Sequence, residues 1–146
     1  WEQMGAEHDA FWGLDGDPSD GAVERSFAQY YATTRDYARF GQMLLDSGSW
    51  KGEQLLPKDY VTRMITPVDA LTDEVNTDYY GYQIWLGVTD DGLPFSLMEG
   101  LRGQMVISIP ALDLVVVRTG YDKSKDKKRN LPGDVFRVID LARALV

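Results

Sequence analysis

The sequence predicts an α+β fold: an antiparallel sheet, a meander of about three to five strands, carries a C-terminal helix, and two further helices lie in the first half of the chain. Two observations predict it. Residues 79–119 contain aromatic and β-branched runs separated by short turns, a pattern typical of antiparallel strands. Three other segments, within 33–47, 57–66 and 132–145, repeat apolar residues at helical spacing. Strands grouped apart from helices favour an α+β plan.

The connecting segments of the first half are predicted to be short strands and turns. Residues 1–20 mix aromatic side chains with a turn-rich end, which predicts a short strand followed by a loop, and residues 22–31 predict a second strand. Glycine punctuates residues 47–54, which predicts a turn. Residues 68–78 are polar and are predicted to form a loop.

Two helices are predicted between these segments. Thr33 or Thr34 can cap the first helix, and Asp36 in its first turn suits the positive end of the helix dipole. Pro57 begins the second helix, because its fixed φ fits the first helical turn, and Pro67 closes it. Both segments carry apolar residues at helical spacing, so both are expected to pack on a core.

The second half reads as a sheet followed by a helix. Residues 79–88 and 94–98 flank an Asp-Asp-Gly turn and predict a hairpin. Two more strands are predicted at 104–109 and 113–119, where three consecutive valines from Val115 indicate a strand covered on both faces. Pro132 then opens a helix that should pack on the sheet through a broad apolar face: Val135, Phe136, Val138, Ile139, Ala142 and Leu145.

Length and composition bound the function classes. The 146 residues, 44% of them hydrophobic, are enough for one domain with a core, and no apolar run reaches the roughly 20 residues that span a bilayer. A net charge of −8 argues against nucleic acid and anionic membranes as partners, since both attract Lys and Arg. The basic cluster at 123–129 is interrupted by aspartates and is interpreted as a solvated loop. No cysteine is available for disulfides or thiol catalysis, and no cofactor or metal is predicted.

Several short patterns imitate functional sites. Residues 15–21, DGDPSDG, resemble a calcium loop, but the glycine falls at position seven and Ser26 stands at position twelve, so a solvated turn is favoured. His8, the single histidine, lies between Glu7 and Asp9 in what looks like a polar surface turn rather than a catalytic triad. Ser124 to Lys127 matches Ser-x-x-Lys but lies in the charged loop, whereas a working pair needs a buried helix start.

The aromatic residues of the chain have two interpretations. Packing in the core and on the sheet is the favoured one, because aromatic side chains dominate core energetics. Some of them are also candidates to line a pocket for an acyl group: Tyr30, Tyr31, Tyr79, Tyr80, Tyr82 and Trp85.

Two longer segments carry a resemblance to a known family. Residues 100–120, GLRGQMVISIPALDLVVVRTG, start with a glycine-spaced run that can bring a backbone close to a ligand, and residues 32–57, ATTRDYARFGQMLLDSGSWKGEQLLP, combine features that helix propensity alone would not produce. Together with residues 1–12, they resemble the serine β-lactamase, penicillin-binding and carboxylesterase family, in the branch that includes 6-aminohexanoate-dimer hydrolases. The resemblance covers most of the chain and implies a partial β-lactamase/transpeptidase-like fold.

The resemblance implies amide or ester hydrolysis through an acyl-enzyme. The family's nucleophile sits in a Ser-x-x-Lys helix far upstream, and this chain begins at Trp1, so residues 1–146 are expected to be a single C-terminal domain or fragment of a larger hydrolase. The N-terminal remainder of the same protein would then be a partner, and the isolated chain is expected to be inactive. The alternative is a stand-alone, non-catalytic binding or structural module that retains the sheet. By family analogy the parent would be periplasmic or exported.

The resemblance also selects site residues. The family's Lys-Thr-Gly or His-Thr-Gly motif falls here on Met98, Glu99 and Gly100, of which only the glycine is retained. In the family, the backbone N–H after that glycine completes an oxyanion hole. The resemblance implies that the corresponding donor in this chain is the backbone N–H of Leu101. Because the amide stabilises the oxyanion, the side chain can change. Substrate-binding candidates are the residues around it: Glu99, Gly100, Arg102, Gly103 and Gln104.

Three further expectations follow from this assignment. Met98 and Glu99 replace the usual cationic or hydroxyl partner of a β-lactam carboxylate, so a small ester or uncharged amide is the expected substrate. The alternative interpretation is a glycine-containing bulge at a strand start. Arg118-Thr119-Gly120 imitates the motif but is expected to be a strand end. A fragment of a larger fold should expose an apolar face and is expected to self-associate.

Overall fold

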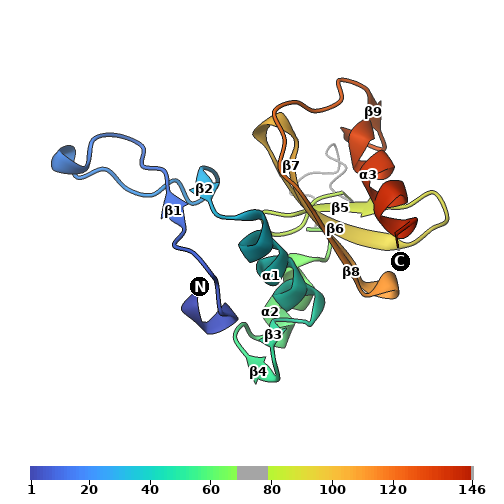
Figure 1. Cartoon of the computed structure of the whole chain (residues 1–146), viewed down its shortest axis with the longest axis horizontal. Coiled ribbons are helices and arrows are strands. Elements are labelled where there is room, and N and C mark those ends of the chain that lie inside the picture. The colour runs from blue at the N-terminus through green and yellow to red at the C-terminus, as the bar shows by residue number, and fades with distance from the viewer. Residues whose placement is uncertain (69–78, 146) are drawn as a thin grey trace.

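The computed structural model describes residues 1–68 and 79–145 and has an α+β fold (Figure 1). Its main sheet contains four antiparallel strands in the order β5-β6-β7-β8. Three helices accompany it: α1 (Thr34–Leu45), α2 (Lys58–Met64) and α3 (Gly133–Arg143). The strands are β5 (Trp85–Val88), β6 (Pro94–Gly100), β7 (Gln104–Ile109) and β8 (Leu114–Arg118). The predicted meander, the terminal helix and the two earlier helices are therefore confirmed.

Short strand pairs and single helical turns complete the described part of the chain. The two-residue strands form three antiparallel pairs: β1 (Phe11–Trp12) with β2 (Tyr30–Tyr31), β3 (Ser49–Trp50) with β4 (Glu53–Gln54), and β9 (Lys127–Lys128) with β10 (Leu131–Pro132). Single turns of 3-10 helix lie at Glu2–Met4, Pro18–Asp20, Leu101–Gly103 and Pro110–Leu112.

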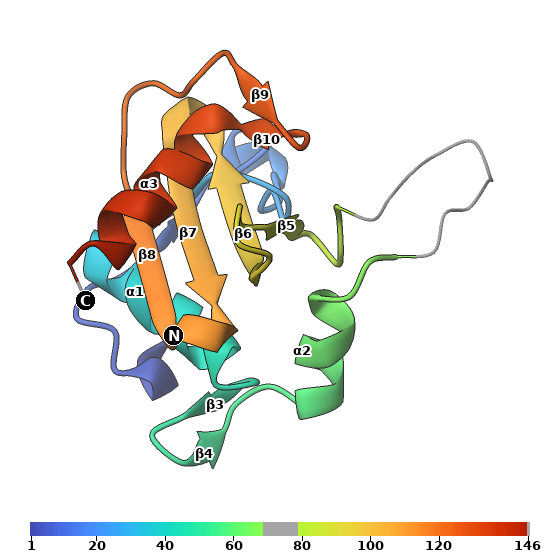
Figure 2. The ribbon, with the colours of Figure 1, turned by 90° about the vertical axis from the view of Figure 1, so that its right-hand side faces the viewer.

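The main sheet is covered on both faces. Leu97, Ile107 and Val116 lie opposite one another on β6, β7 and β8, and they share a core with the buried face of α3. The alternate residues face α1, because side chains of a strand alternate between the two faces. Figure 2 shows α3 in front of the sheet and α1 behind it. The three valines of β8 are thus covered on both sides, as their run predicted.

Gly41 lets α1 lie close against the sheet. A Cβ atom at this position would come within 2.7 Å of Val115 and 2.9 Å of Val106 on the facing strands. Ser108 of β7 donates a hydrogen bond to the Gly41 carbonyl at 3.3 Å. The helix and the sheet are therefore fitted to each other at a position where a larger residue would force them apart.

The predicted helix starts are confirmed. Thr33 caps α1, and its hydroxyl accepts the Asp36 N–H at 3.2 Å. Pro57 and Pro132 are the residues from which α2 and α3 begin. The last residue predicted for the apolar face of α3 is wrong, because the helix ends at Arg143 and the Leu145 side chain is 87% exposed.

Two predicted strands are shorter than expected. Of residues 22–31 only Tyr30–Tyr31 pairs as a strand, because the backbone turns before it, with Gln29 at φ 61°. In residues 79–88 the strand begins at Trp85, because Gln83 has φ 58° and interrupts the extended run. The predicted turn at 47–54 is a tight hairpin. Of the loop predicted at 68–78, residues 69–78 lie outside the described residues.

Candidate functional site

The segment that the sequence singles out is the turn between β6 and β7. Gly100 ends β6, Leu101–Gly103 form one 3-10 turn, and Gln104 begins β7. Arg102 and Gly103 have positive φ values of 61° and 80°. Leu101 is 84% exposed and Arg102 is exposed, whereas Gly103 is buried beneath them. The turn therefore presents Leu101 and Arg102 to solvent.

The two residues before the turn have contacts of their own. Met98 packs against the core cluster shared by α1 and α2. Glu99, on the opposite face, forms an ion pair with Lys123, with its carboxylate 2.7 Å from the Lys123 Nζ, and its side chain is only 11% exposed. The carboxylate that the sequence suggested for substrate binding is thus joined to the segment that follows β8.

Gln104 is fastened to the same segment through its side-chain amide. Its Nε2 donates to the Gly120 carbonyl at 2.5 Å, and the Gly120 N–H donates to its Oε1 at 3.2 Å. This two-way pair mimics one more step of a backbone ladder beyond the end of β8. The end of the turn is therefore fixed relative to the segment that follows β8.

Arg118, the last residue of β8, contacts the turn directly. Its Nη1 donates to the Gly103 carbonyl at 2.7 Å, and its Nη2 donates to the Asp122 carbonyl at 3.0 Å. Asp134 of α3 lies 3.5 Å from the same guanidinium. We call the contacts that Arg118, Gly120 and Lys123 make with residues 99–104 the turn clamp.

Glycine is required where the guanidinium packs. A Cβ atom on Gly103 would lie 1.9 Å from Arg118 Nη1 and 2.6 Å from the Asp122 carbonyl oxygen. A Cβ atom on Gly120 would lie 3.0 Å from the Arg118 Cζ. Arg118-Thr119-Gly120 is the strand end that the sequence predicted, since β8 stops at Arg118. Arg118 and Gly120 nevertheless hold the segment that carries the motif.

A depression of about 440 Å³ borders the turn clamp on the side of α3. Its lining carries both signs of charge and consists of Arg118, Asp122, Lys123, Ser124, Asp126, Asp134 and Arg137. One oxygen of Asp134, Oδ1, is buried and has no hydrogen-bond partner. Leu101 is not among the residues that line this depression.

The Ser-x-x-Lys imitation lies in a loop, as its charged surroundings predicted. The Ser124 hydroxyl accepts the Asp126 N–H at 3.2 Å, and Lys127 is exposed in β9. The surrounding basic cluster is only partly the solvated loop that was predicted, because Lys128 pairs with Asp90 at 2.6 Å and Arg129 donates to the Val88 carbonyl at 2.6 Å.

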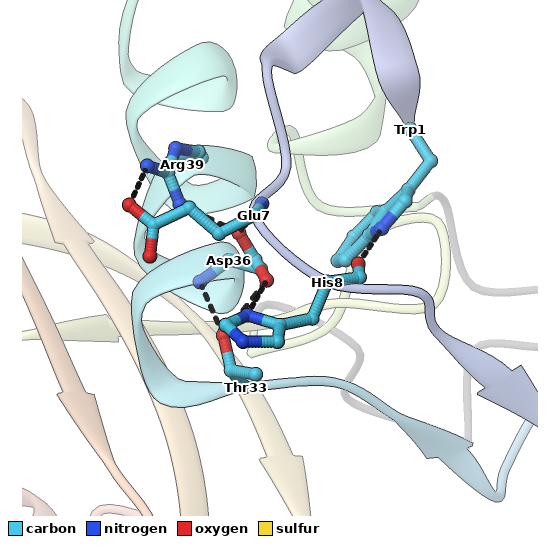
Figure 3. A network of polar contacts seen from close by, with 6 residues as sticks. All are labelled: Trp1, Glu7, His8, Thr33, Asp36 and Arg39. Carbon is cyan, nitrogen blue, oxygen red and sulfur yellow. Dashed lines mark hydrogen bonds and ion pairs between the residues drawn. The ribbon is translucent and has the colours of Figure 1, made fainter.

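A second charged network joins residues 1–8 to α1 (Figure 3). At its centre Asp36 is fully buried and accepts the Glu7 N–H at 2.9 Å and the Thr33 hydroxyl at 2.8 Å. Arg39 bridges Asp36 at 2.6 Å and the Glu7 carboxylate at 2.5 Å. We call this group of four residues the arm anchor. Burial by itself raises the pKa of Asp36, but its hydrogen bonds and the nearby Arg39 charge outweigh that and leave the pKa below its ordinary value.

His8 lies at the edge of the arm anchor. Its Nδ1 is 3.8 Å from Asp36 Oδ2, and its side chain is 64% exposed. Asp36 already accepts bonds from Thr33, Glu7 and Arg39, so its carboxylate serves the arm rather than orienting a catalytic imidazole. The prediction of a polar surface turn is confirmed.

The acidic segment 15–21 uses its carboxylates for turns. Asp17 accepts the Ser19 N–H at 2.8 Å and caps a 3-10 turn, and Asp15 accepts the Val23 N–H at 3.0 Å. Within residues 1–68 and 79–145, no group of three or more His, Cys, Asp or Glu residues is arranged to hold a metal ion. No helix of the described chain is long and apolar enough to cross a membrane.

The aromatic residues pack together, and several of them remain exposed on the N-terminal arm. Tyr30 contacts Trp12 at 4.9 Å and Tyr37 at 6.3 Å between ring centroids, and Tyr79 stacks on Trp85 at 5.9 Å. The arm, residues 1–31, extends away from the sheet in Figure 1. Its exposed large apolar side chains are Phe11, Trp12, Val23, Phe27 and Tyr31.

Comparison with solved structures identifies the fold. The chain superposes on a structure named "Putative 6-aminohexanoate-dimer hydrolase from Bacillus anthracis" with a TM-score of 0.70 and 26% identity, over 99% of this chain and 36% of that one. It also superposes on a "putative beta-lactamase from Bacteroides dorei DSM 17855" with a TM-score of 0.62 and 16% identity, over 97% of this chain and 48% of that one. No family model and no curated protein matches the sequence. The chain therefore spans less than half the length of these structures.

Proposed function

We propose that this chain, which has the fold of part of a β-lactamase-like serine hydrolase, forms the C-terminal portion of an enzyme that cleaves an amide or an ester through an acyl-enzyme. The observation that carries the proposal is the superposition of nearly the whole chain, at 26% identity, on the 6-aminohexanoate-dimer hydrolase structure. The chain would contribute one wall of the site. The nucleophilic serine and its lysine would come from another part of the polypeptide.

The chemical contribution of the chain is proposed to be the backbone N–H of Leu101. In acyl transfer the carbonyl oxygen becomes negative, and fixed amide donors in a site shielded from water stabilise that charge. Leu101 follows Gly100 at the end of β6, on a turn whose neighbours on both sides are fastened to the segment after β8. A donor held in this way needs little reorganisation when the charge develops.

The substrate is proposed to be a small ester or uncharged amide. Met98, at the motif position of the cationic residue, packs into the core, and Glu99 is paired with Lys123. Neither side chain is therefore available to bind a substrate carboxylate. Leu101 and Arg102 are the exposed side chains of the turn and would face the bound substrate.

The rest of the polypeptide is proposed to pack against the N-terminal arm. The arm exposes several large apolar side chains, and this chain covers only 36% of the B. anthracis structure on which it superposes. Exposed apolar patches of this kind mark interaction surfaces or cause association. The isolated chain should therefore self-associate, and size-exclusion chromatography with light scattering would measure this.

A non-catalytic module remains the second candidate, and one observation favours it. The residues at the first two motif positions are Met98 and Glu99. Met98 packs against the core, and Glu99 forms an ion pair with Lys123. A module that kept the sheet and lost the chemistry would tolerate this change. The two proposals differ in what the full reading frame encodes and in whether its product turns over substrate.

Hydrolysis assays test the proposal directly. The isolated chain should hydrolyse neither an activated ester nor a chromogenic cephalosporin above a heat-treated control, since donors without a nucleophile have nothing to stabilise. The product of the full reading frame should hydrolyse the ester. Activity of the isolated chain, or none in the full-length product, would contradict the proposal.

A substitution at Leu101 tests the amide donor. Leu101→Pro removes the N–H at the first position of a helical turn, where proline fits, and should lower kcat of the full-length enzyme by about 10² to 10³-fold. Leu101→Ala is the matched control, because it shortens the exposed side chain and keeps the amide. Equal rates for the two variants would remove Leu101 from the oxyanion hole.

A further inference from the structure

We infer that Arg118 is a positioning residue that fixes the Leu101 amide through the backbone of the β6–β7 turn. This inference rests on the proposed function, because it concerns the same amide donor. Arg118 does not touch Leu101. It acts on Gly103, two residues further along the turn, and its side chain is 30% exposed, so it is mostly enclosed.

The guanidinium group ties two stretches of backbone together. Its Nη1 and Nη2 donate to the carbonyls of Gly103 and Asp122, which belong to the turn and to the segment after β8. The planar fork of arginine presents these donors in a fixed relation, and a lysine ammonium cannot reproduce it. Because Gly103 has no side chain, its carbonyl comes directly onto the fork.

The turn is held on both sides of Leu101. Before it, Glu99 is paired with Lys123 at 2.7 Å. After it, Gly103 is bound to Arg118, and the Gln104 side chain exchanges two hydrogen bonds with Gly120. Between these anchors only Gly100, Leu101 and Arg102 can change their backbone dihedral angles, and Arg102 has a positive φ of 61°. Removing the Arg118 bond to Gly103 should therefore increase the local opening of the turn.

Asp134 supports the same arginine from α3. One of its oxygens lies 3.5 Å from Arg118 Nη1, at a distance that orients the guanidinium by charge rather than by a close bond. The helix that packs on the sheet thereby reaches the proposed oxyanion segment through one side chain. Arg118 thus lies at the junction of β8, α3 and the turn.

Hydrogen–deuterium exchange on this chain tests the clamp without any catalysis. Arg118→Ala should raise the exchange rate of the amides at 100–104 by about tenfold. Without the guanidinium bonds, local opening of the turn costs less free energy. Exchange at 105–109, inside β7, should stay unchanged. Arg118→Lys keeps the charge and most of the packing but loses the fork, so it should give an intermediate increase.

Arg137→Ala is the matched control. Arg137 lines the same depression beside Arg118 but is exposed on α3, so its removal should leave exchange at 100–104 as in the unmodified chain. Unchanged exchange at 100–104 in Arg118→Lys and Arg118→Ala would overturn the inference. So would an increase spread evenly over β5 to β8, because it would mean that Arg118 stabilises the sheet as a whole. If Arg118→Ala does not fold, Arg118→Lys alone decides.

The catalytic consequence is measured separately in the full-length product. Arg118→Lys should lower kcat for an activated ester about tenfold and leave KM nearly unchanged, since a misplaced donor weakens transition-state binding more than substrate binding. An unmodified full-length product without turnover would contradict the proposed function, while the exchange result would still decide whether Arg118 holds the turn. If Arg118→Lys exchanges faster at 100–104 but keeps its kcat, Arg118 does not position the Leu101 amide for catalysis.

Discussion

The arm anchor and the turn clamp both use an arginine to join distant segments, but they join different chemical groups. Arg39 binds two carboxylates, one of them fully buried at Asp36. Arg118 donates chiefly to two backbone carbonyls, and its carboxylate partner is more remote at 3.5 Å. The first arrangement holds an element in place by charge, whereas the second fixes the course of a backbone.

This difference predicts different consequences of damage. A buried carboxylate and its partners depend on one another, so removing one member leaves the others unsatisfied. Carbonyl contacts at a surface turn can be exchanged for water more easily, so their loss should be local. The arm anchor is therefore expected to matter for stability, and the turn clamp for the geometry of the proposed site.

The largest expected effect is that of Asp36→Ala. The change leaves Arg39 without its buried partner and the Glu7 N–H without an acceptor, so the melting temperature should fall on the order of 10 °C. The arm should also become sensitive to limited proteolysis between residues 8 and 29. Thr33→Ser keeps the cap and serves as the control. If Asp36→Ala lowers the melting temperature no more than an ordinary surface substitution does, the buried carboxylate does not stabilise the arm anchor.

Gly103→Ala should be the most damaging change in the turn clamp. The added Cβ meets the Asp122 carbonyl oxygen at 2.6 Å and the Arg118 guanidinium at 1.9 Å, on a backbone with φ of 80°. Strain and collision together should cost about 2–4 kcal/mol in free energy of unfolding, measured by urea denaturation. Gly92→Ala is the matched control, because it has a similar φ of 90° and open space around it. Equal losses would show that strain alone, and not the packing of Arg118, sets the cost.

Sequence patterns predicted the sheet and its helices because local rules decide them. Thr33 caps α1, proline opens α2 and α3, and the valines of β8 lie between two covered faces. The strand predicted at 22–31 failed because a residue with positive φ, Gln29, interrupted a short pattern that no burial reinforces.

The site was only partly accessible to sequence reasoning. The glycine spacing of Gly100 and Gly103 indicated a close backbone approach, but the partner that approaches Gly103 is Arg118, 15 residues later. Contacts of this kind depend on the register of β7 and β8, in which Met105 pairs with Arg118. A hairpin register places residues opposite one another, and a single sequence gives no signal for the side chain that reaches beyond the strand end.

Acid should weaken the arm anchor and spare the two bonds that Arg118 donates to backbone carbonyls in and beside the turn clamp. The folded-state pKa of Asp36 is below its ordinary value, so the stability it contributes is present above about pH 4 and lost as the pH falls through the folded pKa. Asp91 acts in the same direction, because the Arg143 and Thr89 bonds lower its pKa to about 2. Melting temperatures between pH 5 and pH 2 should fall less steeply in Asp91→Asn than in the unmodified chain. Arg118→Lys should keep the full slope, since carbonyl acceptors do not titrate.

The smallest effect is expected from Glu7→Gln, at the exposed end of the arm anchor. The Arg39 and Glu7 atoms are 2.5 Å apart, but the Glu7 side chain is 43% exposed, so water and salt screen the pair. The melting temperature should change by about 3 °C or less, as expected for surface ion pairs. The difference from the unmodified chain should shrink further in 0.5 M salt. The Glu7 backbone N–H still binds Asp36 in this variant, so a loss as large as that of Asp36→Ala would place the strength of the anchor at its surface rather than in the buried carboxylate.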